Sequence, residues 1–384
     1  MGIATPPLCH QLAALYSPQV RTDVAILGAG PGGSAAAILL ARAGYRVALV
    51  EQHRFPREKV CGECLSATGV EVIGRLGLRG AILSRGAVRL RRAILHPPAG
   101  EPVELPLPRA MWGVSRATLD GALLDAARTA GGEVLQPARA EAVAAAGVVV
   151  RDMATNVTRE LPARVVVVAD GKSALLGNAP AATGDLGIKT HYVDVDGPAD
   201  AIELFGVDGH YGGLAAIEGG RWNAAFSVPA ARVKAYGGDL DALFGDVVRD
   251  NACLARRLRH ARRVLPWLAA PLPRFGVRKQ WPRNVVPVGN AAAALEPIGG
   301  EGMGLALRSA ELAAEAIDRA LRAGGAVDTG RLRAAYQALW RTRRAACRAA
   351  AVAVSRPAVA EAGLALVEAS PLLGRVALAA MGKA

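Results

Sequence analysis

Lysine, aromatic residues and paired cysteines are all scarce in this sequence. Only six of its 46 basic residues are lysines, so arginine supplies nearly all of the formal net charge of +13. Aromatic residues make up 4% of the 384 positions and do not interleave with a basic stripe, so we expect no nucleic-acid partner. Five scattered cysteines do not form a disulfide framework and indicate the reducing cytosol. They are Cys9, Cys61, Cys64, Cys253 and Cys347.

Long apolar runs are also missing, and targeting signals are not found. No stretch of about eighteen uncharged apolar residues is present, so we expect no membrane span. Residues 1–20 do not read as a signal peptide, and Pro6 stands where N-myristoylation needs Ser or Thr. With 52% hydrophobic and 21% charged residues, the chain is of globular type, and its length suggests two or three domains.

The first informative motif is a glycine-rich turn between a predicted strand and a predicted helix. An apolar run at 23–27 predicts a buried parallel strand, and Gly28-Ala29-Gly30-Pro31-Gly32-Gly33 follows it directly. Such a turn brings the phosphates of a dinucleotide to the N-terminus of the next helix. A second β-rich run ends at Glu51, which is placed to accept hydrogen bonds from a ribose. This pattern predicts a Rossmann-like domain for FAD or NAD, because an acid there disfavours NADP.

Two later segments resemble a known superfamily. Residues 164–170 predict a strand ending in Asp170-Gly171, and residues 284–290 predict another that leads into Glu296-Pro297-Ile298-Gly299-Gly300-Glu301-Gly302-Met303-Gly304 and a helix. With these motifs the chain resembles the FAD-dependent monooxygenase and geranylgeranyl reductase superfamily, whose fold is that of para-hydroxybenzoate hydroxylase. The resemblance covers residues 22–320.

The resemblance implies an α/β (α+β) fold. It consists of a Rossmann-like FAD-binding domain, an inserted antiparallel β-sheet domain that binds substrate, and C-terminal helices. The expected ranges are 20–85, 108–185 and 280–325 for the FAD-binding domain, 86–107 and 186–279 for the sheet domain, and 326–384 for the helices. FAD is the implied cofactor, with NADH or NADPH as a transient reductant.

The same resemblance assigns cofactor contacts. The expected FAD-binding residues are Gly28, Gly30, Pro31, Gly32, Gly33, Glu51, Gln52, Lys59, Arg116, Asp170, Gly171, Gly289, Asn290, Gly300, Gly302 and Met303. Asn290 replaces the family's aspartate, but its amide oxygen can still accept a ribityl hydroxyl. The family's arginine after Asp-Gly has no counterpart at 172–177. The alternative for Arg116 is a solvent-facing residue on a first helical turn that Ser115 caps.

Cys61 and Cys64 form a CxxC within a second family-like segment. Lys59-Val60-Cys61-Gly62 resembles the Lys-x-Cys-Gly segment of the reductase-like branch, which passes close to the flavin. A redox disulfide and a zinc site are the alternatives. A flavoprotein disulfide reductase carries a second glycine-rich fingerprint for the pyridine nucleotide, which residues 130–384 lack. A zinc site needs about four ligands, and this CxxC supplies two. We therefore expect no metal and interpret Cys61 as a pocket residue beside the flavin.

The substrate region reads as short strands and turns. Strands are expected at 193–196, 201–207, 214–217 and 223–228, with Gly219-Gly220 as a hairpin signal and another strand pair at 87–107. Archaeal geranylgeranyl reductases carry Tyr-x-Trp-x-Phe-Pro in this sheet, and only Tyr211 is kept here. The Trp-x-Trp-x-Ile-Pro motif of flavin halogenases is absent. Candidate pocket residues are Cys61, His210, Tyr211 and Trp281, with His191 beside them, although a lone histidine is more often structural.

The C-terminal part predicts helices. Residues 331–355 are arginine-rich with a helical pattern, and 357–381 are mostly apolar with a break at Pro371. These helices either cap the FAD-binding domain or form a surface that touches membrane lipid, which would make the protein peripheral to a membrane.

The leading functional hypothesis is an NAD(P)H-using monooxygenase, a hydroxylase of a small aromatic or polyketide-like substrate that is apolar or carrier-bound. The first alternative is an FAD-dependent ene-reductase of the geranylgeranyl reductase type. The second is a non-catalytic flavin-binding protein that transfers electrons.

Overall fold

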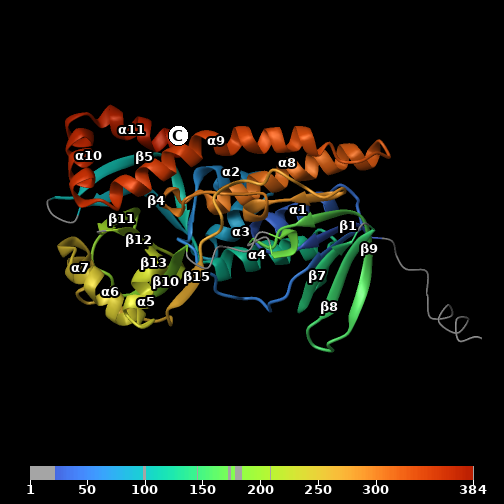
Figure 1. Ribbon diagram of the computed structural model, residues 1–384, viewed down its shortest axis with the longest axis horizontal. Coiled ribbons are helices and arrows are strands. Elements are labelled where there is room, and N and C mark those ends of the chain that lie inside the picture. Colours follow the sequence, from blue (N-terminus) through green and yellow to red (C-terminus); the bar gives the residue numbers. More distant parts are fainter. Residues whose placement is uncertain are drawn as a thin grey trace, which may run out of the picture.

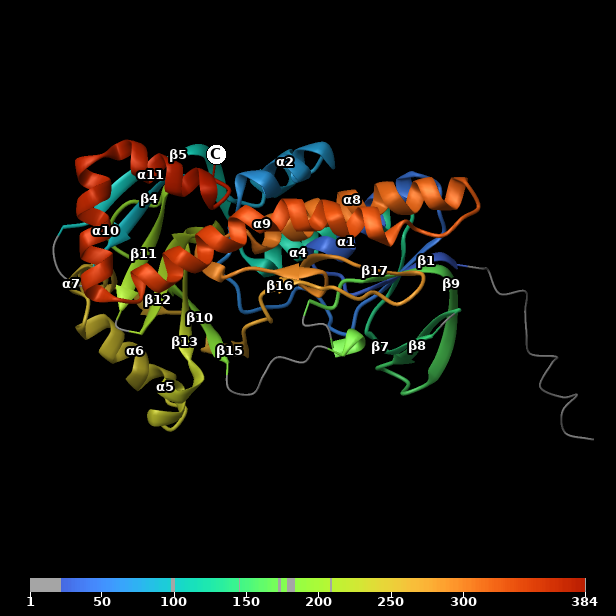
Figure 2. The same cartoon turned by 45° about the horizontal axis from the view of Figure 1, so that its top comes forward.

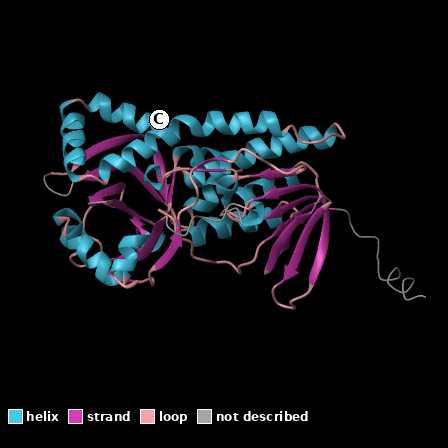
Figure 3. Cartoon of the chain, in the orientation of Figure 1, coloured by secondary structure: helices cyan, strands magenta, loops and turns pink. Residues whose placement is uncertain are grey.

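The computed structural model describes residues 22–97, 101–144, 146–171, 174–177, 184–207 and 209–383. Two large sheets lie at opposite ends of the molecule, and long helices run along it (Figures 1 and 3). This mixed α/β arrangement, with a Rossmann-like unit, a second sheet and C-terminal helices, confirms the predicted fold class.

The first sheet has a parallel core. Its strand order is β6-β2-β1-β9-β8-β7, and β17 pairs with β9. β1, β2, β6, β9 and β17 run parallel, whereas β7, β8 and β9 pair antiparallel as a meander. The bounds are β1 Thr22–Leu27, β2 Val47–Val50, β6 Glu133–Leu135, β7 Ala138–Ala144, β8 Gly147–Asp152, β9 Thr158–Val168 and β17 Val285–Pro287.

Alternate residues of β1 face two different layers. Val24 and Ile26 pack in one core with helices, whereas Ala25 and Leu27 pack in another with β8. A strand covered on both faces must be apolar throughout, which explains the unbroken apolar run seen in the sequence. The helices of the first core include α1 Pro31–Arg42, α2 Ala67–Arg75, α3 Arg79–Leu83, α4 Arg116–Thr129 and α8 Gly302–Arg322.

The second sheet has the order β14-β10-β13-β12-β11-β4-β5-β3, and β15 pairs with β10. Its neighbouring strands are antiparallel except β11 and β4. The bounds are β3 Cys64–Leu65, β4 Val88–His96, β5 Val103–Gly113, β10 Asp185–Val193, β11 Ala201–Val207, β12 His210–Ala216, β13 Trp222–Pro229, β14 Arg262–Arg263 and β15 Leu268–Pro271. A small pair, β16 Gly276–Val277 and β18 Ala293–Ala294, lies apart.

The expected strand at 193–196 is wrong. β10 ends at Val193, because Asp194 adopts a left-handed backbone with φ of 58° that turns the chain out of the sheet. The hairpin signal at Gly219-Gly220 lies where expected, between β12 and β13, and both glycines have positive φ. The sheet also includes β3 and all of β5. β3 and the last part of β5 lie outside the range 86–107 that was expected for the sheet domain.

Period-two alternation gives this sheet two different faces. Phe205, Leu214 and Phe226 pack against α6 Leu240–Arg249 and α7 Ala252–Leu258. Their neighbours Leu204 and Ser227 line a cavity on the opposite face. A short helix, α5 Ala230–Ala235, follows β13.

Three helices follow α8, and the first of them, α9, runs along the molecule and connects its two halves, whereas the other two lie at the end with the second sheet (Figure 2). The three helices are α9 Thr329–Val354, α10 Pro357–Ala369 and α11 Pro371–Ala380, close to the predicted helical segments. The first part of α9 buries Tyr336 and Trp340 in the core of the FAD-binding domain, and Cys347 farther along packs with Tyr211 of the second sheet. No single described helix is long and apolar enough to cross a membrane; α9 and α10 pass that test only as a pair bent by 115°.

Candidate functional site

The glycine-rich turn between β1 and α1 has the geometry that a dinucleotide requires. Gly28 has φ of +103°, and a Cβ there would lie 2.6 Å from the Ala169 carbonyl oxygen. A Cβ on Gly33 would lie 1.8 Å from the Gly28 oxygen, so this position needs glycine for helix packing. Gly30 instead has an extended backbone, and the nearest atom to a Cβ there would be 3.7 Å away. Helix α1 begins at Pro31, so the positive end of the helix dipole lies at the turn.

Glu51 braces this turn from the end of β2. Its side chain is buried, and its two carboxylate oxygens accept hydrogen bonds from the backbone N–H groups of Ala29 (2.9 Å) and His53 (2.9 Å). A carboxylate has about four acceptor positions, so capacity for a ribose hydroxyl remains. Gly28, Gly30 and Glu51 line an open cleft of about 810 Å³ together with Gln52, Lys59 and Asp170.

Arg116 lies beside the same turn, so the alternative of a solvent-facing arginine is not what the fold shows. Its guanidinium is the group 3.7 Å from a Cβ on Gly30, and it is buried. Nε donates to Asp120 Oδ1 at 2.9 Å, and Arg57 lies 3.3 Å from the same carboxylate. Burial disfavours its charge, but Asp120 outweighs this and raises the pKa of Arg116. Ser115 caps α4, as the sequence suggested.

Asn290 lies between a small recess and a second, inner cavity. It follows Gly289, whose φ is +58° and whose N–H donates to Ser309 Oγ at 2.9 Å. The exposed Asn290 side chain lines a small recess of about 80 Å³ with Gly171, and also lines the inner cavity. Val60 lines both the inner cavity and the outer cleft, so the two spaces share walls.

The inner cavity has a volume of about 210 Å³ and lies between the second sheet and the loop before α8. Gly300, Gly302 and Met303 form part of its wall on the loop side. Apolar and backbone groups dominate the lining. Its polar or acidic lining residues are Glu63, Tyr211, Ser227, Asn290 and Glu296.

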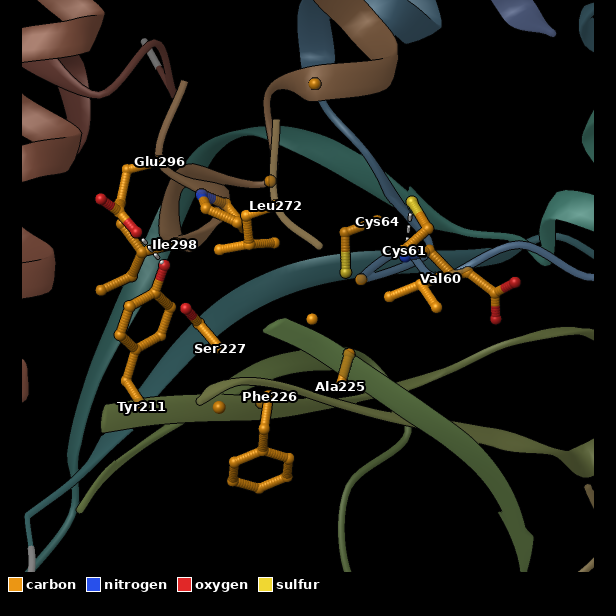
Figure 4. Close-up of a pocket in the computed structure, with 18 of the residues that line it drawn as sticks. Val60, Cys61, Cys64, Tyr211, Ala225, Phe226, Ser227, Leu272, Glu296 and Ile298 are labelled. Carbon is orange, nitrogen blue, oxygen red and sulfur yellow. Dashed lines mark hydrogen bonds between the residues drawn. The ribbon is translucent and has the colours of Figure 1, made fainter. Parts of the chain in front are cut away.

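Tyr211 and Glu296 occupy one end of this cavity, and Cys61 and Cys64 the other (Figure 4). The Tyr211 hydroxyl donates to Glu296 Oε1 at 2.9 Å, and Arg348 donates to Glu296 Oε2 at 2.9 Å. Burial and the Glu296 carboxylate raise the pKa of Tyr211, so its hydroxyl stays protonated at any physiological pH.

Cys61 and Cys64 are both free thiols. Burial raises the pKa of the Cys64 thiol to about 12, so it is protonated and unreactive near neutral pH. Cys61 is half-buried at the cavity wall. Both thiols line the cavity, and Cys61 is the more exposed of the two.

A buried charged cluster behind this wall was missed by the sequence reasoning. Glu63 accepts from Lys189 Nζ at 2.6 Å and from the backbone N–H of Arg116 at 2.8 Å, and it contacts His191 Nε2 at 2.7 Å. Lys189 also donates to Glu58 at 2.7 Å. Burial opposes the charge of Glu63, but His191 and Lys189 outweigh burial and lower its pKa.

Glu58, Glu63 and His191 have the spacing of a metal site, but the Lys189 ammonium already lies between the two carboxylates. Lysine is rarely buried without a partner. Lysine is scarce in this sequence, with six residues, and this scarcity is a signal by which Lys189 and Lys383, both buried, could have been singled out.

Some expected pocket residues lie elsewhere. His210 is buried next to Tyr211 on β12, but it does not line the inner cavity, because successive strand residues face opposite sides. Trp281 packs on Tyr336 with ring centroids 5.6 Å apart, in the core of the FAD-binding domain. His191 faces Glu63 rather than the cavity. Of the segment that lacks the family's arginine, residues 172 and 173 lie outside the described residues.

Comparisons with known proteins agree with this geometry. Residues 21–194 match the model of an FAD binding domain. A menaquinone reductase from Mycobacterium tuberculosis is 30% identical over 324 residues, which cover 77% of this chain and 76% of that protein. The chain belongs to the FAD-dependent monooxygenase and geranylgeranyl reductase superfamily. This flavoprotein is therefore an FAD-binding oxidoreductase, as the sequence motifs predicted.

The flavoprotein is also similar to a monooxygenase in sequence and to a brominase in fold. A kynurenine 3-monooxygenase from Xanthomonas campestris is 26% identical, over 80% of this chain and 73% of that protein. The solved structure of a flavin-dependent brominase superposes with a TM-score of 0.78 at 19% identity, covering 95% of this chain and 94% of that chain. At that identity the likeness concerns the fold alone.

Proposed function

We propose that this flavoprotein is an NAD(P)H-dependent FAD monooxygenase that hydroxylates a small, uncharged aromatic or polyketide-like molecule. The observation that carries the proposal is the inner cavity, which adjoins the dinucleotide cleft and is small and mostly apolar. Its volume of about 210 Å³, part of which the flavin ring would occupy, is below the roughly 300–1,000 Å³ of common ligand pockets, which favours a small substrate over a long isoprenoid. Lys, Arg and His are absent from its described lining, so a carboxylate-bearing substrate would lack a counter-charge.

The residues present fit FAD. Gly28, Gly30 and the N-terminus of α1 would hold the pyrophosphate, and Glu51 would bind the ribose. The exposed amide oxygen of Asn290 would accept a hydrogen bond from a ribityl hydroxyl at the wall of the inner cavity. Gly300, which has no side chain to intrude, and Met303 would face the flavin ring. Bound FAD supplies the two-electron chemistry with NAD(P)H and O2.

The protein's own task is to orient the substrate and exclude water. In the overall reaction NAD(P)H gives two electrons and a proton takes part; one oxygen atom of O2 enters a C–H bond of the substrate and the other leaves as water. Tyr211 is held as a neutral hydroxyl by Glu296, so it can orient an uncharged polar substituent. The apolar lining at Leu204, Ile298 and Leu272 would keep water away from the reacting atoms.

Alkene reduction is the second candidate. It is supported by the 30% identity to a menaquinone reductase and by the Lys59-Val60-Cys61-Gly62 segment at the cavity wall. In that reaction a hydride and a proton add across a C=C bond and O2 takes no part.

Oxygen stoichiometry separates the candidates. The purified FAD-loaded protein is mixed with NADH or NADPH and a panel of phenols, naphthols and alkenyl naphthoquinones, with O2 uptake and product mass recorded. We expect substrate-dependent NAD(P)H oxidation with one O2 consumed per product that gains one oxygen. A product that gains two hydrogens under anaerobic conditions would instead establish the reductase. Flavin reduction without conversion of any panel member would favour the electron-transfer alternative.

A further inference from the structure

The residues that follow α11 turn back into the molecule. Gly382 has φ of +93°, its N–H donates to the Ala379 oxygen, and the Lys383 N–H donates to the Leu378 oxygen, each at 2.9 Å. These two bonds form a Schellman motif, which needs a left-handed residue such as glycine at its turn. The motif fixes the direction of Lys383, whose side chain is 6% exposed.

The Lys383 ammonium lies against the loop that lines the inner cavity. Nζ donates to the Gly299 carbonyl oxygen and to Met111 Sδ at 3.2 Å. A Cβ on Gly300, a residue of the cavity wall, would lie 3.6 Å from Nζ. The charge is thus separated from the cavity by a single layer of backbone.

This loop carries two buried acids, and cations of the C-terminal segment lie beside both. Arg348 of α9 pairs with Glu296 at 2.9 Å. Glu301, just before α8, has Lys383 at 3.5 Å and Arg343 of α9 at 3.8 Å. Three cations therefore face two carboxylates, which leaves the loop one positive charge in excess at the N-terminus of α8.

We propose that Lys383 makes the loop electropositive so that it stabilises the negative charge that a flavin in the inner cavity acquires on reduction. Hydride transfer from NAD(P)H brings two electrons and one proton to the oxidised ring, which then carries one negative charge, and NAD(P)+ leaves. Lys383 acts through the loop without touching the substrate. The dipole of α8 has the same sign at this end and adds to the effect. The inference rests on the proposed placement of the flavin ring in this cavity.

Replacing the charge gives a direct test. Lys383→Met keeps the aliphatic stem, Lys383→Arg keeps the charge, and Lys234→Met removes an exposed lysine of α5 as the matched control. The readouts are the midpoint potential of the bound FAD against reference dyes and the dissociation constant of sulfite, whose addition to oxidised flavin also leaves negative charge on the ring.

We expect Lys383→Met to raise the dissociation constant of sulfite about tenfold and to lower the equilibrium constant for flavin reduction by a similar factor. A charge a few ångströms from a titrating group changes its equilibrium by about this much. A tenfold change corresponds to about 30 mV for a two-electron couple. Lys383→Arg and Lys234→Met should stay close to the unchanged protein. Unaltered potential and sulfite affinity in an FAD-loaded Lys383→Met would overturn the proposal.

A second variant covers the case in which Lys383→Met does not retain FAD. Arg343→Met removes another cation beside Glu301, this one from α9, and it should likewise lower the midpoint potential and raise the dissociation constant of sulfite. No shift in that variant would also overturn the proposal. Failure of the unchanged protein to bind FAD would instead contradict the family assignment, so the two failures are distinguishable.

Discussion

Gly28 and Gly30 are two residues apart but need glycine for different reasons. Gly28 has a positive φ and no room for a Cβ, whereas Gly30 has an ordinary backbone and open space above it. We expect Gly30→Val to fold normally but to lose FAD, because the side chain would fill the space of the pyrophosphate. Gly28→Val should unfold at a lower temperature even without cofactor. Thermal unfolding and FAD titration of both variants check this; a Gly30→Val protein that binds FAD normally would contradict the placement.

Asn290 tests the ribityl contact, at the position where the chain departs from its family. Asn290→Asp should keep FAD, because the carboxylate offers an acceptor of nearly the same shape. Asn290→Leu should bind FAD about tenfold to a hundredfold more weakly, since an unpaired buried hydroxyl costs roughly 1–3 kcal/mol. The added charge of the aspartate should also lower the reduction potential. Titration of apoprotein with FAD measures the affinity, and equal affinity for the leucine variant would show that Asn290 does not contact the cofactor.

At the scale of elements, Glu63 joins three parts of the chain. It links the segment that carries Cys61 to β10 through Lys189 and His191, and to the first residue of α4. Glu63→Gln leaves the Lys189 ammonium without one of its two carboxylates, so we expect a loss of about 3 kcal/mol in unfolding free energy at pH 7. The control is Glu71→Gln, which breaks a half-exposed pair with Arg109 and should cost less than about 1 kcal/mol.

The same variant has a defined pH dependence. The folded-state pKa of Glu63 is lowered, so the carboxylate stabilises the fold above its ordinary pKa, and this contribution is lost as pH falls through the lowered value. The difference between the unchanged protein and Glu63→Gln should therefore be full at pH 7 and should shrink in acid below the ordinary glutamate range. Urea unfolding across this range checks the sign, and a difference that grows on acidification would contradict it.

At the scale of the whole molecule, exposed apolar side chains gather on α10 and α11. They are Val359, Leu366, Leu372, Leu373 and Val376, each between 46% and 66% exposed. Arginine-rich α9 precedes them, and the chain carries a net charge of +13. We propose that this face docks on an anionic lipid bilayer, where apolar burial and electrostatic attraction act together.

Vesicles of phosphatidylglycerol and phosphatidylcholine test this docking. We expect the protein to sediment with them, less so at high salt, and the combined change Leu372→Ser, Leu373→Ser and Val376→Ser to reduce sedimentation about tenfold. Met153→Ser with Val157→Ser, two exposed apolar residues of the β8–β9 hairpin, is the matched control and should bind normally. Equal sedimentation of the two variants would rule out this face.

Local patterns in the sequence determined much of this protein. The turn at Gly28–Gly33, the acid Glu51 and the strand before Asp170 are each read within a short window, since hydrophobic periodicity and glycine spacing are local properties. They were enough to predict the FAD-binding fold and the superfamily, both of which are confirmed. The strand at 193–196 failed because the β-like run was given more weight than Asp194, a residue type that tolerates the left-handed conformation it adopts here.

Only the tertiary structure decided which distant charges meet. Glu63 and Lys189 are 126 residues apart, and Lys383 lies 84 residues from Gly299. Tyr211 lines the cavity and His210 does not, because neighbouring residues of β12 face opposite sides of the sheet. The packing of α6 and α7 on one side decides which face of β12 is left to line the cavity. Buried ion pairs have no periodic signature, because each partner is selected by what the fold places opposite it. The electrostatic surroundings of the cavity therefore depend on how the C-terminal helices return to the loop before α8.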